Sequence, residues 1–184
     1  MKGLVFRLLE NMVVDRLGLQ AWDTLVAQTE LRTRGGFIGS ETYPDEDLIA
    51  LVRTASRLTG RPVDELLRSF GRYVFPDLVG WYVTIVAERE GAKSFLMSVD
   101  RSIHLEVRKL HVGAVVPEFT YEDLEPNRLV MIYRSERRLC DLAEGLIEGV
   151  GDHFGEDIRQ EQTRCTKRGH DHCRFELFFA GRRP

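Results

Sequence analysis

Apolar residues recur every three or four positions over the first 75 residues, which is the spacing of amphipathic helices. Gly18 separates the first predicted helix from the second, and the glycine-rich stretch 35–40 favours a loop. The acids that follow Pro44 are typical of a helix start, and Gly60 ends this third helix before a fourth begins. We therefore predict a helical subdomain over residues 1–75.

Residues 76–184 mix the helical and strand periods, so we predict an α+β subdomain there and a single domain over residues 1–184. Pro76 is expected to interrupt the fourth helix, which leaves the type of the following apolar run undecided. Helical spacing returns over 94–110 and stops near Pro117. The remaining elements are predicted as a strand, a long helix and two hairpin strands, at 128–135, 136–154, 158–166 and 174–179.

Composition and charge limit the function classes. The 184 residues contain 26 Lys and Arg against 29 Asp and Glu, and a net charge of −3 argues against general nucleic-acid binding. The longest apolar run, 78–87, is half of the roughly 20 residues that a membrane span needs. The amino terminus lacks a signal-peptide pattern, and three cysteines are too few for a disulfide scaffold. We expect a cytoplasmic protein that binds neither nucleic acid nor membrane.

One histidine has neighbours that favour a specific chemistry. His104 shares a helix face with Leu96, Asp100, Ile103 and Val107, so its imidazole is expected beside mostly apolar side chains. A lone histidine in this position is commonly packed in a core or half-exposed. The alternative is an axial ligand of heme iron, which needs a neutral imidazole facing an apolar cavity.

A second group follows the predicted strand. With a period of two, Tyr133, Ser135 and Arg137 share one face and offer two hydroxyls and a planar guanidinium. Such a set suits the binding of carboxylates. Polar residues that face solvent at a strand end would give the same pattern.

Together these features resemble one family. A helical histidine, a later proline and a Tyr-x-Ser-x-Arg motif before a helix are similar to the heme nitric oxide/oxygen binding (H-NOX) family, which includes bacterial gas sensors and the heme domain of soluble guanylate cyclase. The similarity spans nearly the whole chain, from Met1-Lys2-Gly3-Leu4-Val5 through 94–110 to 144–149. One departure is His111-Val112, where many bacterial relatives have Tyr-Pro.

The resemblance implies a heme b cofactor and gives roles to individual residues. His104 would be the proximal iron ligand, and Pro117 would press on the porphyrin and help to hold it out of plane. The residues implied to hold the heme propionates are Tyr133, Ser135 and Arg137, and those implied to line the pocket are Val5 and Leu146. Without the resemblance, Pro117 would simply end a turn, and the two aliphatic residues would be ordinary core.

The resemblance also bears on which gas binds. In oxygen-binding members, a distal tyrosine in the helix after the motif donates a hydrogen bond to bound dioxygen, and the matching position here is Leu142. We therefore expect nitric oxide and carbon monoxide to bind, without stable binding of dioxygen. Tyr73 and Tyr82 are the alternatives that would reach the pocket from elsewhere.

The cysteines form a third group. Cys165 and Cys173 bracket the predicted hairpin, which would bring them side by side, and Cys140 would complete the group from the long helix. Three thiolates and an imidazole suit tetrahedral Zn²⁺, whereas scattered buried thiols would behave as small hydrophobes. Some bacterial H-NOX proteins have a similar three-cysteine, one-histidine zinc site, but their histidine just before the middle cysteine has no counterpart here. We take His170 as the fourth ligand and His172 as the alternative, because a strand directs His172 and Cys173 to opposite faces.

The sequence supports two hypotheses of function. The first is a stand-alone heme sensor of nitric oxide that signals by losing the bond between iron and His104. No kinase, cyclase or chemoreceptor signature is present, so the signal would pass to a separate protein such as a histidine kinase or a cyclic-di-GMP enzyme. The second is a redox sensor in which oxidation of the cysteines releases zinc. We expect no enzyme activity, because the sequence has no phosphate-binding loop and no nucleophile motif.

Overall fold

The computed structural model describes residues 1–33, 35–110 and 113–182, apart from the side chains of Leu124 and Arg182. Its helices are α1 (Gly3–Leu17), α2 (Leu19–Ala27), α3 (Asp45–Thr59), α4 (Val63–Trp81), α5 (Val83–Ala87), α6 (Ala92–Ser98), the π-helix η1 (Val99–Ile103), α7 (His104–Leu110), α8 (Cys140–Phe154) and the 3₁₀ turn η2 (Thr166–Arg168). Its strands are β1 (Glu118–Glu125), β2 (Arg128–Arg134), β3 (Glu156–Arg164) and β4 (Cys173–Arg182). The departure at His111-Val112 lies outside the described residues.

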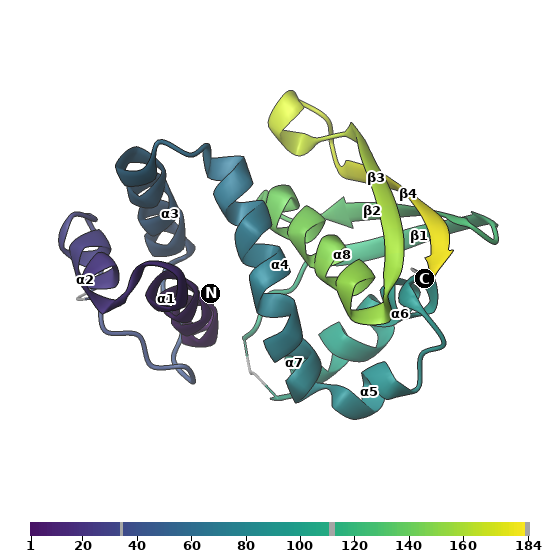
Figure 1. Cartoon of the computed structure of the whole chain (residues 1–184), viewed down its shortest axis with the longest axis horizontal. Helices are drawn as coiled ribbons and strands as arrows, with labels where there is room; N and C mark the ends of the chain where they lie inside the picture. Colours follow the sequence, from purple (N-terminus) through teal and green to yellow (C-terminus); the bar gives the residue numbers. More distant parts are fainter. Residues whose placement is uncertain (34, 111–112, 183–184) are drawn as a thin grey trace.

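The first three helices follow the predicted pattern and lie together on one side of α4 (Figure 1). Gly18 separates α1 from α2 with a φ of 86°, in the left-handed region that favours glycine. Acidic residues fill the first turn of α3, and Gly60 ends that helix in a left-handed conformation. The apolar faces of these helices and of α4 enclose one hydrophobic core, which includes Phe6, Leu48, Leu51, Leu67 and Phe70.

Pro76 does not interrupt α4, so that prediction is wrong. The helix continues to Trp81 with the proline inside it, and the apolar run 78–87 divides between the end of α4 and α5. Proline removes a backbone hydrogen bond and tends to break a helix. Here α4 packs closely along α8, since a Cβ built at Gly71 would lie 2.2 Å from the carbonyl oxygen of Leu142. This close packing stabilises α4 on both sides of the proline.

The second half of the chain forms an antiparallel sheet with strand order β1-β2-β4-β3. Strand β2 and the β3–β4 hairpin were predicted and are confirmed, but β1 was not predicted. The alternation of Phe119 and Tyr121 is the signal for it, and acidic neighbours obscure that signal. These two residues pair with Tyr133 and Met131 of β2. A second hydrophobic core fills the space between this sheet, α6 and α8.

Helix α8 begins at Cys140 rather than near residue 136, which corrects the predicted start. Arg138 has a φ of 53°, a left-handed conformation that a helix cannot continue through. Its N–H donates to the carbonyl oxygen of Ser135 at 3.3 Å and closes a turn between β2 and α8. This turn, rather than the strand, therefore places residues 135–137.

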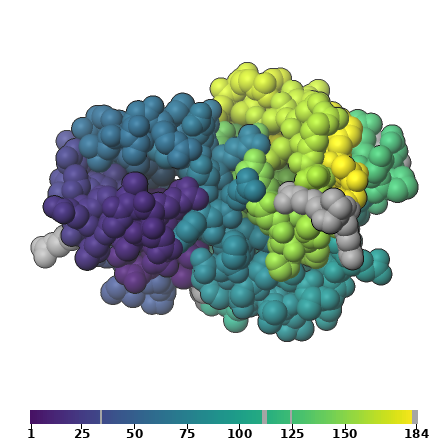
Figure 2. Space-filling view, viewed as in Figure 1, coloured from purple at the N-terminus to yellow at the C-terminus, as the bar shows by residue number. Residues whose placement is uncertain are grey.

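The two cores confirm the α+β class that the sequence predicts, with helices first and the sheet afterwards. Figure 2 shows them as two lobes, one built from the amino-terminal helices and one from the later helices and the sheet. Leu146 of α8 packs against both cores, and α4 contributes Phe70 to one and Phe75 to the other. Within the described residues, every helix is too short or too polar to cross a membrane.

Candidate functional site

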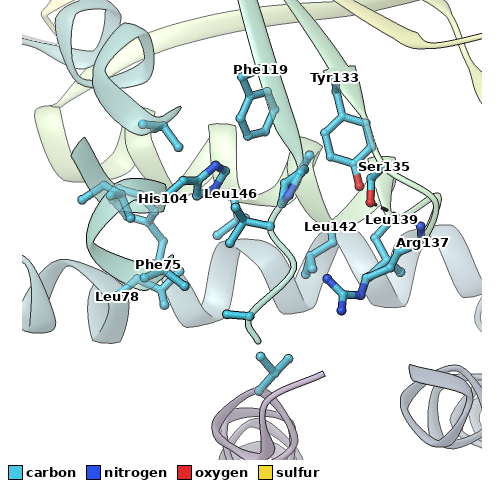
Figure 3. Close-up of a pocket in the computed structure, with 18 of the residues that line it drawn as sticks. Phe75, Leu78, His104, Phe119, Tyr133, Ser135, Arg137, Leu139, Leu142 and Leu146 are labelled. Atoms are coloured by element: carbon cyan, nitrogen blue, oxygen red, sulfur yellow. Dashed lines mark hydrogen bonds between the residues drawn. The ribbon is translucent and has the colours of Figure 1, made fainter. Parts of the chain in front are cut away.

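A cavity of about 350 Å³ lies between the two lobes. Helices α1, α4, α5, α6, α7 and α8 and strands β1 and β2 all contribute to its wall. Figure 3 labels lining residues from α4, α7, α8, β1 and β2. Most of the lining side chains are aliphatic or phenylalanine, which makes the cavity an apolar binding site. The exceptions with polar side chains in the described lining are Lys2, Thr42, Tyr82, His104, Tyr133, Ser135 and Arg137.

His104 is the first residue of α7, and no other histidine is found in the described lining of the cavity. Its side chain is 12% exposed and stacks on Phe119, with ring centroids 5.4 Å apart. Burial lowers the pKa of His104, and the carboxylate of Asp100 opposes this shift only in part. The imidazole is therefore neutral at neutral pH, which is the form that binds a metal.

Tyr133, Ser135 and Arg137 also line the cavity, on the side away from His104 in Figure 3. The predicted period of two does not extend through them, because β2 ends at residue 134 and the following turn carries the last two. Burial raises the pKa of Tyr133 to about 12, so its hydroxyl keeps its proton. The Nε of Arg137 donates to the Oδ2 of Asp45 at 2.5 Å.

The other residues implied by the resemblance lie around the same cavity. Leu142 and Leu146 are one turn apart on α8, Val5 comes from α1, and Pro117 precedes β1. All four are in the lining. The structure thus brings together every residue that the resemblance implies for a heme pocket, although these residues are spread over most of the chain.

The two tyrosines that were alternatives for reaching the pocket differ. Tyr82 lines the cavity, and burial and the charge of Glu106 on α7 raise its pKa. Tyr73 is not in the described lining, and its hydroxyl donates to the carboxylate of Asp15 on α1. Only Tyr82 therefore keeps its place as an alternative.

This donor set fits a heme. The apolar wall suits a porphyrin, the neutral imidazole of His104 suits an iron ion, and the hydroxyls and guanidinium of Tyr133, Ser135 and Arg137 suit carboxylates. When bound, heme would supply an iron that takes a diatomic gas. No described group in the wall provides that chemistry itself, whereas the wall residues can hold the cofactor, orient it and exclude water.

Comparison with known families agrees with this geometry. The family model described as Haem-NO-binding matches residues 2–162. The chain belongs to the haem-NO-binding family. This is the family whose motifs the sequence resembles, and the match covers every residue of the described cavity lining except Met1, including His104 and the Tyr-x-Ser-x-Arg motif.

Solved H-NOX structures share the whole fold. An H-NOX protein from S. oneidensis in the Fe(II)NO state is 29% identical, with a TM-score of 0.91 over 98% of this chain and 100% of that one. An unliganded Fe(II) H-NOX protein from K. algicida is 27% identical, with a TM-score of 0.88 over 98% and 97%. The IWP-051-bound H-NOX from Shewanella woodyi in the Fe(II)CO state is 32% identical, with a TM-score of 0.84 over 100% and 97%.

The three cysteines form a separate buried cluster. The sulfur atoms of Cys140, Cys165 and Cys173 all lie within 4.8 Å of one another. Burial and the charge of Asp141 raise the pKa of Cys140. Burial also acts to raise the pKa of Cys165, but hydrogen bonds from the backbone at Lys167 and from neighbouring groups outweigh it and lower that pKa. A cluster of this kind can hold a thiophilic metal ion such as Zn²⁺.

The fourth ligand of this cluster stays a prediction. Within the described part of the chain, no histidine nitrogen belongs to the cluster. The Nδ1 of His170 lies 3.3 Å from the backbone nitrogen of Cys165, and its side chain is exposed. His172 is buried, and its Nδ1 lies 2.8 Å from a carboxylate oxygen of Asp171.

Two neighbours of the cavity were not identified from the sequence. Phe119, which stacks on His104, belongs to the unpredicted strand β1. Asp45, interpreted only as an acid at a helix start, accepts from Arg137 and also lies 2.6 Å from the amino group of Met1. Alternating residues would have revealed Phe119, but no sequence pattern links Asp45 to an arginine 92 positions away.

Proposed function

We propose that this protein is a heme-based sensor of nitric oxide that also binds carbon monoxide. The observation that carries the proposal is His104, a neutral imidazole in an otherwise apolar wall, with Tyr133, Ser135 and Arg137 on the other side of the cavity. In this function His104 binds the iron of heme b and the other three bind its propionates. Pro117 would press on the porphyrin from the chain segment before β1. The NO and CO states of related H-NOX structures support this choice of gases.

We further propose that dioxygen does not bind stably. An Fe–O₂ unit carries partial negative charge and gains from a hydrogen-bond donor, whereas NO on ferrous iron needs one much less. Leu142, Leu146 and Val5 provide no donor on their part of the wall. The phenol of Tyr82 is a hydrogen-bond donor. The charge that raises its pKa, after burial, is that of Glu106, which lies two residues beyond His104 on α7. We propose that Tyr82, which lines the cavity from the turn between α4 and α5, belongs to the part of the wall near α7.

The signal would begin with release of His104 from the iron when NO binds. His104 and α7 would then relax, and the lobe of the amino-terminal helices would shift against the lobe of the sheet. Helices α4 and α8 would transmit the shift, because both contact both cores. The receiver would be a separate signalling protein such as a histidine kinase or a cyclic-di-GMP enzyme.

The ligand assignment is tested with His104→Ala. The purified ferrous protein should show a heme Soret band that shifts when NO is added, and the variant should lose the native ferrous spectrum until imidazole is supplied. His153→Ala removes an exposed histidine from α8 and serves as the control that keeps the wild-type spectrum. A native ferrous spectrum in His104→Ala without imidazole would reject the assignment.

A second candidate function is a thiol-based redox sensor. The sulfur atoms of Cys140 and Cys165 are 3.7 Å apart, so little movement would join them. Hydrogen peroxide would take two electrons from the two sulfur atoms, forming a disulfide and, with two protons, two molecules of water. The two protons come from the thiols themselves or, where zinc holds the sulfur atoms as thiolates, from solvent, and the zinc ion is released. Metal analysis before and after peroxide, on heme-loaded and heme-free protein, distinguishes the two functions. Zinc loss after peroxide with unchanged NO binding would show that the cysteine cluster and the heme cavity act independently. A protein that holds no zinc and forms no disulfide would reject this candidate function.

A further inference from the structure

The carboxylate of Asp100 lies against one ring nitrogen of His104. Its Oδ1 is 3.4 Å from the His104 Nδ1, within hydrogen-bond distance, and the two residues are four positions apart. Their side chains are 31% and 12% exposed, so the contact is partly shielded from water. In the described part of the chain, no lysine or arginine forms an ion pair with Asp100. His104 is therefore the main partner of this carboxylate.

The backbone around Asp100 is unusual. Residues Val99–Ile103 form a π-helix between α6 and α7, in which the N–H of His104 donates to the carbonyl of Val99, five residues earlier. A π-turn takes one residue more than an α-turn, so it shifts the face of the following helix by one residue. This turn packs on β1, where burial and the charge of Asp100 raise the pKa of Tyr121. Tyr121 of the sheet is thus close enough to Asp100 to be affected by its charge.

The ring of His104 interacts with the backbone of Pro117 as well as with Asp100, and the shorter-range contact that the geometry gives, Nδ1 to Asp100, bears on which ring nitrogen is free. A neutral imidazole has one N–H, and if Nδ1 donates it to Asp100, the lone pair remains on Nε2. A carboxylate that accepts from Nδ1–H fixes the ring orientation and makes the other nitrogen a stronger ligand. We propose that Asp100 is a positioning residue that holds His104 in this tautomer and strengthens its bond to iron. This inference rests on the heme function proposed above.

The consequence concerns the response to gas. A stronger bond between His104 and iron makes the release of His104 slower after NO binds, so Asp100 would set how readily the sensor switches. Removing the carboxylate should weaken the bond and speed the release. Mutation of an outer partner of this kind typically lowers metal affinity or activity by about 10-fold or more.

The first test uses heme-free protein and does not depend on gas binding. Nitrogen-15 NMR of the imidazole should show the Nδ1–H tautomer for His104 in the wild type and a shift toward Nε2–H in Asp100→Ala. Asp100→Asn keeps an acceptor without the charge and should lie between them. Glu106→Gln removes a carboxylate that pairs with Lys109 on α7, and this control should keep the wild-type tautomer. The same tautomer in Asp100→Ala and wild type would overturn the proposal.

The second test uses ferrous heme-loaded protein. Resonance Raman spectroscopy should show a lower iron–histidine stretching frequency in Asp100→Ala, an intermediate one in Asp100→Asn and an unchanged one in Glu106→Gln. Stopped-flow absorption should show His104 released about 10-fold faster after NO binding in Asp100→Ala. An unchanged stretching frequency would overturn the proposal, and Asp100→Asn decides the matter if the alanine variant does not fold. If wild-type protein binds no heme, the proposed function fails, while the tautomer measurement still tests the contact itself.

Discussion

The apolar cavity and the cysteine cluster are built in opposite ways. The cavity draws residues from most helices and two strands, and its wall is held by packing around a single imidazole. The cluster is formed by the start of α8 and the β3–β4 hairpin alone, and its three sulfur atoms lie close enough together to bind one metal ion. The cavity therefore depends on how the two lobes are arranged, whereas the cluster depends only on how the start of α8 meets the β3–β4 hairpin.

Helix α8 nevertheless belongs to both regions. It begins at Cys140 in the cluster, and Leu142 and Leu146 then face the cavity. A change in the position of α8 should therefore affect both sites, whereas a change at one side chain should affect one site alone. The variants below separate these two cases.

Gly145→Ala should have the largest effect, because it acts where α4 and α8 touch. A Cβ at this position would lie 1.9 Å from the carbonyl oxygen of Arg68, so the two helices must separate. We expect a loss of about 3 kcal/mol in the free energy of unfolding and a melting temperature lower by about 6–12 °C. Heme retention and metal content should both fall. Calorimetry and absorption spectroscopy measure these effects.

Gly80→Ala is the matched control for this variant. Gly80 is also on α4, but a Cβ there would meet no atom within 4 Å. Alanine is the better helix former, so this variant should be as stable as wild type or slightly more stable. Equal stability of the two alanine variants would show that α4 and α8 tolerate separation.

Cys173→Ser should affect the cluster alone. If zinc binds the folded chain, raising free zinc to 100 times its dissociation constant stabilises the wild type by about 2.7 kcal/mol, and the serine variant should show no such gain. Thermal unfolding with zinc or a chelator measures this difference, and the NO-bound heme spectrum should stay unchanged.

His170→Ala should weaken zinc binding, whereas His172→Ala should leave it unchanged. If His172→Ala weakens zinc binding and His170→Ala does not, the fourth zinc ligand is His172.

Leu142→Tyr should affect the cavity alone. Its phenol would add a hydrogen-bond donor to the wall, and bonds to charged groups contribute about 1.5–3 kcal/mol, or about 10–100-fold in affinity. We expect dioxygen binding to become measurable by absorption titration while NO binding and zinc content are unchanged. Leu142→Phe adds the ring without the hydroxyl and should gain no dioxygen affinity. Stable dioxygen binding by the wild type would contradict the proposed selectivity.

Much of the fold and of the cavity could be predicted from the sequence. Helical periodicity and breakers such as Gly18 and Gly60 located the first helices, and the motif around Tyr133 located the far wall. Long-range packing was not predictable: α4 continues through Pro76 because α8 supports it. The start of α8 depends on the left-handed Arg138, a conformation that arginine does not signal. The contact between Asp45 and Arg137 could not be predicted for the same reason, because only the fold brings these two residues together.

Asp45→Asn should have the smallest effect, at the rim of the cavity. Burial acts to raise the pKa of Asp45, but hydrogen bonds from Arg137 and the amino terminus outweigh it and bring the pKa below its ordinary value of 3.8. A carboxylate with a depressed folded pKa stabilises the protein fully above its unfolded pKa and loses this contribution as the pH falls through the folded value. Because the carboxylate is 37% exposed, solvent screening limits the contribution to about 1 kcal/mol or less. Urea unfolding should therefore show a difference in stability between wild type and Asp45→Asn at pH 6, and this difference should narrow as the pH falls below 3.8. Glu46→Gln, which changes an exposed acid in the same turn, should show a smaller difference at pH 6. A gap that persists below the folded pKa would mean that the side chain supports the cavity rim by packing rather than by charge.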